Sequence, residues 1–97
     1  MENKRYTIEE GGVLYVADGV TSINQDEFKG FDQITRVILP RMVCRIESGA
    51  FQNCKRMKSI NIPQGVDIVG PWAFADCALK EIDLPEGLKR IESRAFR

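Results

Sequence analysis

The chain has no histidine among its 97 residues, only three cysteines and only one tryptophan. Histidine is the side chain that most often serves as a general base, so its absence removes the commonest starting point for acid–base catalysis. No glycine-rich phosphate loop and no activated-nucleophile motif takes its place. Without a Cys-x-x-Cys pair or a fourth cysteine, a structural zinc site also lacks its usual ligands. We therefore expect no enzyme, no metal centre and no cofactor.

The chain also lacks an excess of charge of either sign and any long apolar run. Fourteen basic and fourteen acidic side chains cancel, so nucleic acids and anionic membranes have little electrostatic attraction for it. No stretch approaches the roughly 18 apolar residues of a membrane-spanning helix. Residues 1–5 are not followed by the apolar core of a signal peptide, so either the protein is cytoplasmic or a leader has been removed from an exported one. We expect no nucleic-acid partner and no membrane insertion.

What the chain does have is an internal repeat. Phenylalanine recurs at intervals of 23, 23 and 22 residues, and proline keeps the same spacing. A period of this length is typical of a solenoid, in which each coil buries its apolar face against the next. The recurring positions are Phe28, Phe51, Phe74, Phe96, Pro40, Pro63 and Pro85. We expect a single domain spanning 1–97, with a cap at 1–12 and repeats at about 13–34, 35–57, 58–79 and 80–97.

Each repeat unit combines two local patterns. Apolar residues two positions apart, such as Val37 and Leu39, share one face only in a strand, and the proline that follows ends that strand. Further on, a serine or proline holds the position at which a helical turn can begin (Ser48, Pro71 and Ser93). We therefore expect an α/β solenoid, a right-handed array of about four coils that each contain a short parallel strand, a turn and a helical turn.

The first repeat is preceded by the nearest approach to a paired-carboxylate site, Glu9 and Glu10. These residues precede two glycines and lie between two alternating apolar stretches, 6–8 and 13–16. This arrangement is typical of a β-hairpin turn. Such a hairpin would also close the first end of the stack, as a terminal cap does.

The repeat unit resembles the BspA-like leucine-rich repeat family, whose pattern is close to L-x-x-I-x-I-P-x-x-V-x-x-I-G-x-x-A-F-x-x-C. The resemblance extends over roughly residues 13–97, and the first repeat departs from it by placing Glu27 where the pattern has alanine. It implies a horseshoe segment with its strands on the concave side. It also implies a binding module of the kind frequent on bacterial cell surfaces and associated with adhesion to other cells or host proteins, hence a cell-surface or secreted location.

The three cysteines are best interpreted as structural. Cys54 and Cys77 hold the same position one coil apart, so their Cβ vectors should run parallel, which suits a disulfide poorly. We interpret both as small buried hydrophobes. Cys44 falls at a variable position and should be exposed and reduced, and an odd number of cysteines argues against a disulfide scaffold.

Function is expected on the outward columns of the strand face, because alternation along each strand sends every second side chain away from the core. Apolar and basic groups gather in the first half of these columns and acidic groups in the second, which predicts a two-signed groove for a protein or peptide. The alternative is an ordinary solvated strand face. The predicted partner-binding residues are Tyr15, Arg36, Ile38, Ser59, Asn61, Glu81 and Asp83.

Trp72 is a further candidate, because the repeat requires no aromatic residue at its position. Tryptophan is enriched among interface hot spots, although single exposed apolar residues are common. We regard Trp72 as a possible hot spot.

The last repeat stops at Phe96 and Arg97, before the Cys-x-x-Leu that completes the unit. Such an end leaves apolar residues poorly covered and a strand at 80–84 as an open parallel edge. Two functions therefore stay open: a binding module that uses the strand face, and an assembly unit that associates through this end, as a homo-oligomer or within a longer array. The end-on residues are Leu84, Leu88, Ile91 and Phe96.

Overall fold

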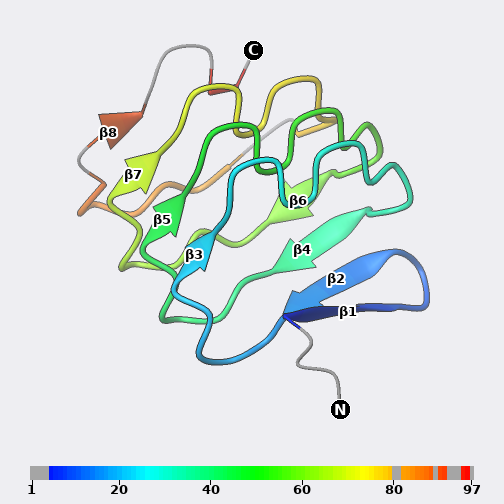
Figure 1. Cartoon of the computed structure of the whole chain (residues 1–97), viewed down its shortest axis with the longest axis horizontal. Coiled ribbons are helices and arrows are strands. Elements are labelled where there is room, and N and C mark those ends of the chain that lie inside the picture. Colours follow the sequence, from blue (N-terminus) through cyan, green and yellow to red (C-terminus); the bar gives the residue numbers. More distant parts are fainter. Residues whose placement is uncertain (1–4, 80–81, 89, 92–94, 97) are drawn as a thin grey trace.

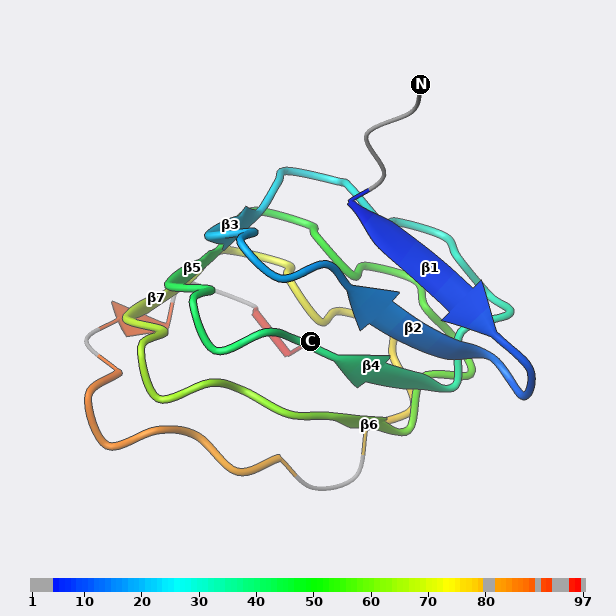
Figure 2. The same cartoon turned by 90° about the horizontal axis from the view of Figure 1, so that it is seen from below.

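The computed structural model describes residues 5–79, 82–88, 90–91 and 95–96, which form a flattened coil with a β-sheet on each of two opposite sides (Figure 1). Seen from below, the first sheet runs along one side and the second along the other, with the coils crossing between them (Figure 2). The first sheet has the order β1(Tyr6–Glu9), β2(Val13–Val16), β4(Arg36–Ile38) and β6(Ser59–Ile60). The second has the order β3(Ser22–Ile23), β5(Arg45–Ile46), β7(Ile68–Val69) and β8(Arg90–Ile91).

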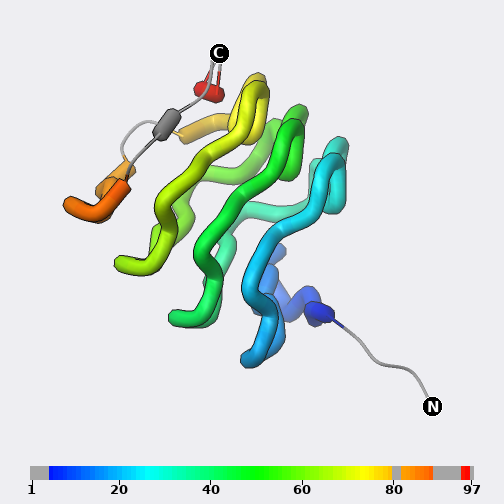
Figure 3. The backbone as a smooth tube through the Cα atoms, turned by 60° about the vertical axis from the view of Figure 1, so that its left-hand side comes forward, coloured from blue at the N-terminus to red at the C-terminus, as the bar shows by residue number. Residues whose placement is uncertain are grey.

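The predicted repeat appears directly in the strand register. Leu14 lies opposite Val37, and Val37 lies opposite Ile60, so residues 23 positions apart in the sequence are neighbours across parallel strands. Successive coils therefore lie side by side like the turns of a spring (Figure 3). The expected solenoid with its parallel sheet is confirmed.

The second sheet was not predicted. Its strands are two residues long, which is too short to show the alternation that identifies a strand in a sequence. Its members pair in parallel one repeat apart, with Ile23 opposite Ile46 and Ile46 opposite Val69. The core therefore lies between two parallel-paired sheets, and each coil passes from one sheet to the other.

The predicted N-terminal hairpin is confirmed. β1 and β2 pair antiparallel with Glu9 opposite Val13, and the Gly12 N–H donates to the Glu9 carbonyl at 3.1 Å. Gly11 and Gly12 have φ angles of 85° and 82°, a left-handed conformation that costs glycine little and other residues more. Glu9 and Glu10 therefore flank a turn.

The helical turn expected near Ser48 consists of successive tight turns, and no α-helix occurs in the described part of the chain. The Ala50 N–H donates to the Glu47 carbonyl at 3.2 Å. Gly49 has a φ of 66°, which lies outside the right-handed helical region, and the next turn is closed by the Gln52 N–H, which donates to the Gly49 carbonyl at 3.0 Å. The Phe51 N–H donates to the Ala73 carbonyl of the next coil at 2.8 Å.

Among the described residues, no helix could cross a membrane.

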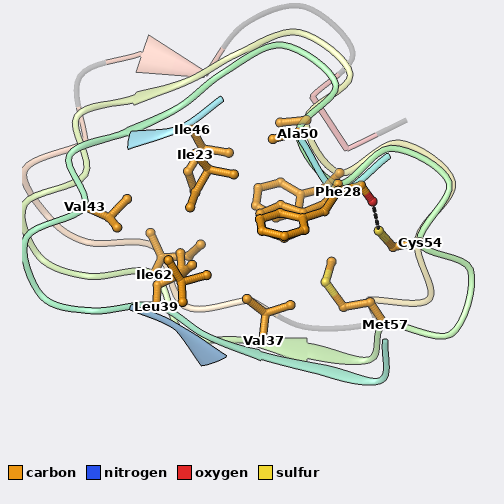
Figure 4. Close-up of a cluster of buried hydrophobic side chains, with 14 of the residues drawn as sticks. Ile23, Phe28, Val37, Leu39, Val43, Ile46, Ala50, Cys54, Met57 and Ile62 are labelled. Carbon is orange, nitrogen blue, oxygen red and sulfur yellow. Dashed lines mark hydrogen bonds between the residues drawn. The ribbon is translucent and has the colours of Figure 1, made fainter. Parts of the chain in front are cut away.

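A column of phenylalanine rings passes through the middle of the core (Figure 4). Phe28, Phe51, Phe74 and Phe96 are stacked with centroid distances of 5.4, 5.6 and 5.2 Å and interplanar angles of 14°, 7° and 10°. The first three rings are almost completely buried. Stacked aliphatic columns surround them, such as Ile23 with Ile46 (Figure 4). Each coil therefore covers the apolar face of the one before it.

The N-terminal end of this column is closed by aromatic and ionic contacts. Tyr6 and Phe31 meet the Phe28 ring edge-on, at centroid distances of 5.0 and 5.5 Å. Arg5 holds the Glu27 carboxylate through two hydrogen bonds of 2.6 and 3.0 Å, and the bond to Glu27 raises the pKa of Arg5. The departure of the first repeat at Glu27 is thus part of the cap.

The strand expected at 80–84 is not seen where the structure describes it. Residues 80–81 lie outside the described residues, and 82–84 do not pair as a strand. β6 is therefore the last described strand of the first sheet. Leu84, expected to be poorly covered at this end of the stack, is 40% exposed.

We predict that Gly70→Ala destabilises the fold by about 2 kcal/mol, as overpacking typically does. A Cβ atom at Gly70 would lie 2.7 Å from the Ser48 nitrogen and 2.9 Å from the Glu47 carbonyl carbon, both backbone atoms of the preceding coil. The control is Gly65→Ala, whose Cβ would come no closer than 3.7 Å to the Val43 oxygen. Urea denaturation measures both; equal stabilities of the two variants would contradict the prediction.

Candidate functional site: a groove over the first sheet

A groove with a volume of about 380 Å³ lies over β4, β6 and the segment 83–85. In Figure 2 the coils carrying these segments follow one another as successive layers. The groove is lined by Arg36, Val37, Ile38, Ser59, Ile60, Asn61, Ile62, Gln64, Asp83, Leu84 and Pro85. A second hollow of about 370 Å³ shares Asn61 and Gln64 with it and extends toward Arg41.

The structure brings together most of the residues predicted for partner binding. Five of the seven line the groove: Arg36, Ile38, Ser59, Asn61 and Asp83. Tyr15 lies beside it, opposite Ile38 in the pairing of β2 with β4, and is 46% exposed. Glu81 lies outside the described residues. Partner binding by this set stays a prediction.

Of the apolar residues that line the groove, sequence reasoning assigned only Ile38 to partner binding. Alternation placed Ile60 in the core, whereas Ile60 is half-buried and lines the groove. Leu84 was assigned to end-on association and also lines the groove. Both residues lie beside the described segment 82–84, which does not pair as a strand.

The Asn61 side chain is occupied within the fold. The Leu39 N–H donates to Asn61 Oδ1 at 2.7 Å, and Asn61 Nδ2 donates to the Leu39 carbonyl at 3.0 Å. This amide replaces the backbone pairing that would otherwise continue the ladder past β4 and β6. Asn61 therefore shapes the groove, and its polar atoms are less available to a ligand.

The charged groups of the groove are unpaired. Among the described residues, no side chain forms an ion pair with Arg36 or Asp83, and no group hydrogen-bonds the Ser59 hydroxyl. On the second sheet, by contrast, Arg45 contacts Glu47 at 3.3 Å. Among the described lining residues, Arg36 is the one cation and Asp83 the one anion, and each can pair with a ligand.

Trp72 does not line the groove. It is half-buried, and its φ of 65° corresponds to that of Gly49 and of Asp26 in the equivalent turns. A bulky residue in this left-handed region is a genuine backbone outlier, with a cost on the order of 1–2 kcal/mol. Its role as a hot spot stays a prediction.

Cys54 is buried and Cys44 is exposed, as the sequence predicted, whereas Cys77 is only half-buried. All three are free. Cys54 is buried and its thiol donates to the Phe28 carbonyl at 3.1 Å, while the Cys77 thiol donates equivalently to Phe51 at 3.0 Å. The neighbouring Cys77 thiol and burial raise the pKa of Cys54, so its thiol stays protonated and is a poor nucleophile. Cys44 is exposed.

Metal chemistry finds no support in the described segments. They contain no group of three or more histidine, cysteine, aspartate or glutamate side chains that could hold an ion.

A stack of 23-residue coils with an in-register parallel sheet is the architecture of leucine-rich repeat proteins. The sequence model of the family described as "BspA type Leucine rich repeat region" matches residues 17–97 in six copies. The chain therefore belongs to the BspA-type leucine-rich repeat family. No curated protein matches it significantly.

Two solved structures are similar to all or most of this chain. A leucine-rich repeat protein from Bacteroides ovatus superposes with a TM-score of 0.81 at 28% identity, over 100% of this chain and 32% of that one. The T. pallidum leucine-rich repeat protein superposes with a TM-score of 0.74 at 25% identity, over 89% of this chain and 49% of that one. The chain thus spans about a third of one relative and about half of the other.

Family and fold together indicate the general role of the chain. Leucine-rich repeat domains are generally non-enzymatic scaffolds that mediate protein interactions. In such scaffolds the interactions are made by surfaces, and the groove is one such surface of this chain.

We predict that Asn61→Ala lowers the free energy of unfolding by about 1–2 kcal/mol, because it leaves two backbone groups of Leu39 without their partner. Ser59→Ala on the same face is the control and should change stability by less than about 0.5 kcal/mol. Thermal or urea unfolding tests both variants. An Asn61→Ala protein as stable as the control would show that the two hydrogen bonds between the Asn61 amide and the Leu39 backbone contribute nothing to stability.

Proposed function

We propose that the chain is a non-enzymatic interaction module that binds a protein or peptide in the groove over β4 and β6. The observation that carries this proposal is the groove itself, a hollow of about 380 Å³ lined by Arg36 and Asp83, neither of which forms an ion pair with another described residue. Paired charges across an interface give specificity and fast association. A surface whose charges are not satisfied within the fold is suited to such a partner.

The apolar lining adds a second source of affinity. Leu84 is 40% exposed, and Ile38 and Ile60 are half-buried. Covering apolar area stabilises a complex by roughly 25 cal/mol per Å². Tyr15, exposed beside Ile38, would extend the contact toward the N-terminal hairpin. Glu81, which lies outside the described residues, remains a proposed partner-binding residue.

We further propose a role in adhesion at a bacterial cell surface. The similarity to leucine-rich repeat proteins of Bacteroides ovatus and T. pallidum supports a bacterial setting.

A photo-crosslinking experiment tests the groove. With p-benzoylphenylalanine in place of Ser59, we expect an adduct with a protein of the source organism. Arg36→Glu or Asp83→Lys in the same background should lower its yield by about fivefold or more, because each leaves an interface charge facing a like charge. The cross-linker at Lys55, an exposed residue outside the groove, is the control. An adduct insensitive to both charge reversals would contradict the proposal.

A second candidate function is assembly through the end of the stack. Phe96 stacks on Phe74 at 5.2 Å and is still 40% exposed, and Leu88 is half-buried. Exposed apolar surface of this kind favours association with a matching surface. The side chain of Ile91 lies outside the described residues. Trp72 is the other residue that we propose as a contact.

We expect Phe96→Asp to reduce self-association in sedimentation-velocity experiments, because a carboxylate would be buried at the interface. Arg36→Glu is the control and should leave the sedimentation coefficient unchanged. A wild-type protein that is monomeric at micromolar concentration would exclude this second function for the chain.

A further inference from the structure

The Asn61 side chain shows how the fold satisfies backbone groups that face the next coil. Leu39 lies just beyond the end of β4 and directly before Pro40, so its backbone is no longer part of a strand ladder. The Leu39 N–H donates to Asn61 Oδ1 at 2.7 Å, and Asn61 Nδ2 donates to the Leu39 carbonyl at 3.0 Å. A carboxamide from the next coil therefore supplies both the acceptor and the donor that this backbone needs.

Ile62 holds the same position one coil later, because it also lies directly before a proline. The Asn61 N–H donates to the Val37 carbonyl of β4 at 3.4 Å, and Asn61 is exposed while Ile62 is buried, the alternation of an extended segment. The backbone groups of Ile62 therefore face away from β4, toward the groove that Ile62 lines. No described residue forms a hydrogen bond with them. Ile62 thus presents to the groove the pair of groups that Leu39 presents to Asn61.

The last coil does not carry a carboxamide at the position of Asn61. Asp83 stands there, two residues before the proline of its coil, and lines the groove. An ionised carboxylate only accepts hydrogen bonds, whereas a carboxamide both donates and accepts. Gln64 brings a carboxamide to the groove lining, but it forms no hydrogen bond with Ile62. The donor and the acceptor of Ile62 are therefore available to a partner.

A partner that covers the groove has to satisfy both of these groups, because burying a backbone N–H or carbonyl without a hydrogen bond costs free energy. Ammonium and guanidinium groups only donate and carboxylates only accept, while asparagine and glutamine offer a donor and an acceptor on separate atoms. The neighbouring surface is apolar, since Ile60 is half-buried and Leu84 is 40% exposed. A carboxamide flanked by apolar side chains matches this combination.

We propose that the groove binds an asparagine or glutamine side chain of a partner segment, whose carboxamide pairs with the Ile62 N–H and carbonyl as Asn61 pairs with Leu39. Apolar side chains on either side of that residue rest on Ile60 and Leu84. This inference rests on the proposed function of the groove and names the chemical group that the groove recognises.

Amide hydrogen exchange followed by NMR tests the site in the free protein. Leu39 is the internal control, because its N–H is held by Asn61. We expect the Ile62 N–H to exchange at least about tenfold faster than the Leu39 N–H. Equal protection of the two amides would overturn the inference, because Ile62 would then already have a partner within the chain. Protection of Ile62 that grows with protein concentration would also overturn it, because a second copy of the chain would then occupy the groove.

Fluorescence anisotropy with labelled, capped pentapeptides tests the ligand. Wild-type protein should bind Ser-Leu-Asn-Leu-Ser at least about fivefold more tightly than the same peptide with aspartate or leucine at its centre. A backbone ester at position 62, which replaces the N–H by oxygen and keeps the side chain, should reduce this preference to less than about twofold. The matched control is an ester at position 55, an exposed position outside the groove, which should leave the preference unchanged.

Three results with the peptides would overturn the inference. If the three peptides bind equally well, the groove does not recognise a carboxamide, while the proposed function stands. If none of them binds, this ligand class is wrong, and the cross-linking from position 59 still tests the groove independently. If the ester at position 62 retains the full preference for asparagine, the carboxamide is bound somewhere other than at Ile62.

Discussion

The phenylalanine rings of successive coils are stacked nearly parallel, with centroid distances between 5.2 and 5.6 Å, and the rest of the structure depends on this spacing. Offset stacking of this kind is favourable beyond the apolar area that it buries. The same step allows the Phe51 N–H to reach Ala73 at 2.8 Å. It also allows the Cys77 thiol to reach the Phe51 carbonyl at 3.0 Å. The aromatic contacts, the backbone hydrogen bonds and the thiol hydrogen bonds therefore all form at the same spacing between neighbouring coils.

At the groove, the strand ladder and the aromatic column no longer continue together from one coil to the next. Beyond β6 the chain no longer forms the strand ladder in the described segment 82–84. The Phe74 ring still meets Phe96 at 5.2 Å, so the core continues while the surface of the sheet opens. Leu84 and Ile60 become accessible as a result. The groove is therefore open while the aromatic column stays continuous.

The sequence predicted the parts of the structure that depend on repetition. The spacing of Val37 and Leu39 predicted the first sheet, and the 23-residue step predicted its register. The second sheet could not be predicted, because a pair such as Arg45–Ile46 contains no periodicity of its own. The left-handed turn position was hidden as well, since Trp72 occupies it in place of a residue that prefers it.

The candidate site was predicted in its polar part and at Ile38. Arg36 and Asp83 were found because alternation directs them outward, and both line the groove. The apolar floor depends on the path of residues 82–84, which is a tertiary property. The hydrogen bonds between the Asn61 side-chain amide and the Leu39 backbone likewise join two neighbouring coils. Contacts between coils decide these features, and a single repeat unit does not contain them.

The in-register stacking also bears on how such a surface can diverge. Every outward position recurs once per coil, as Arg36 and Ser59 do on adjacent strands. Moving a charge to the equivalent position of the next coil therefore displaces it by one strand spacing of about 4.8 Å, with no demand on the core. Equivalent outward positions on the paired strands are evenly spaced. A single surface substitution can therefore change the distance between two ligand-contacting groups by one strand spacing.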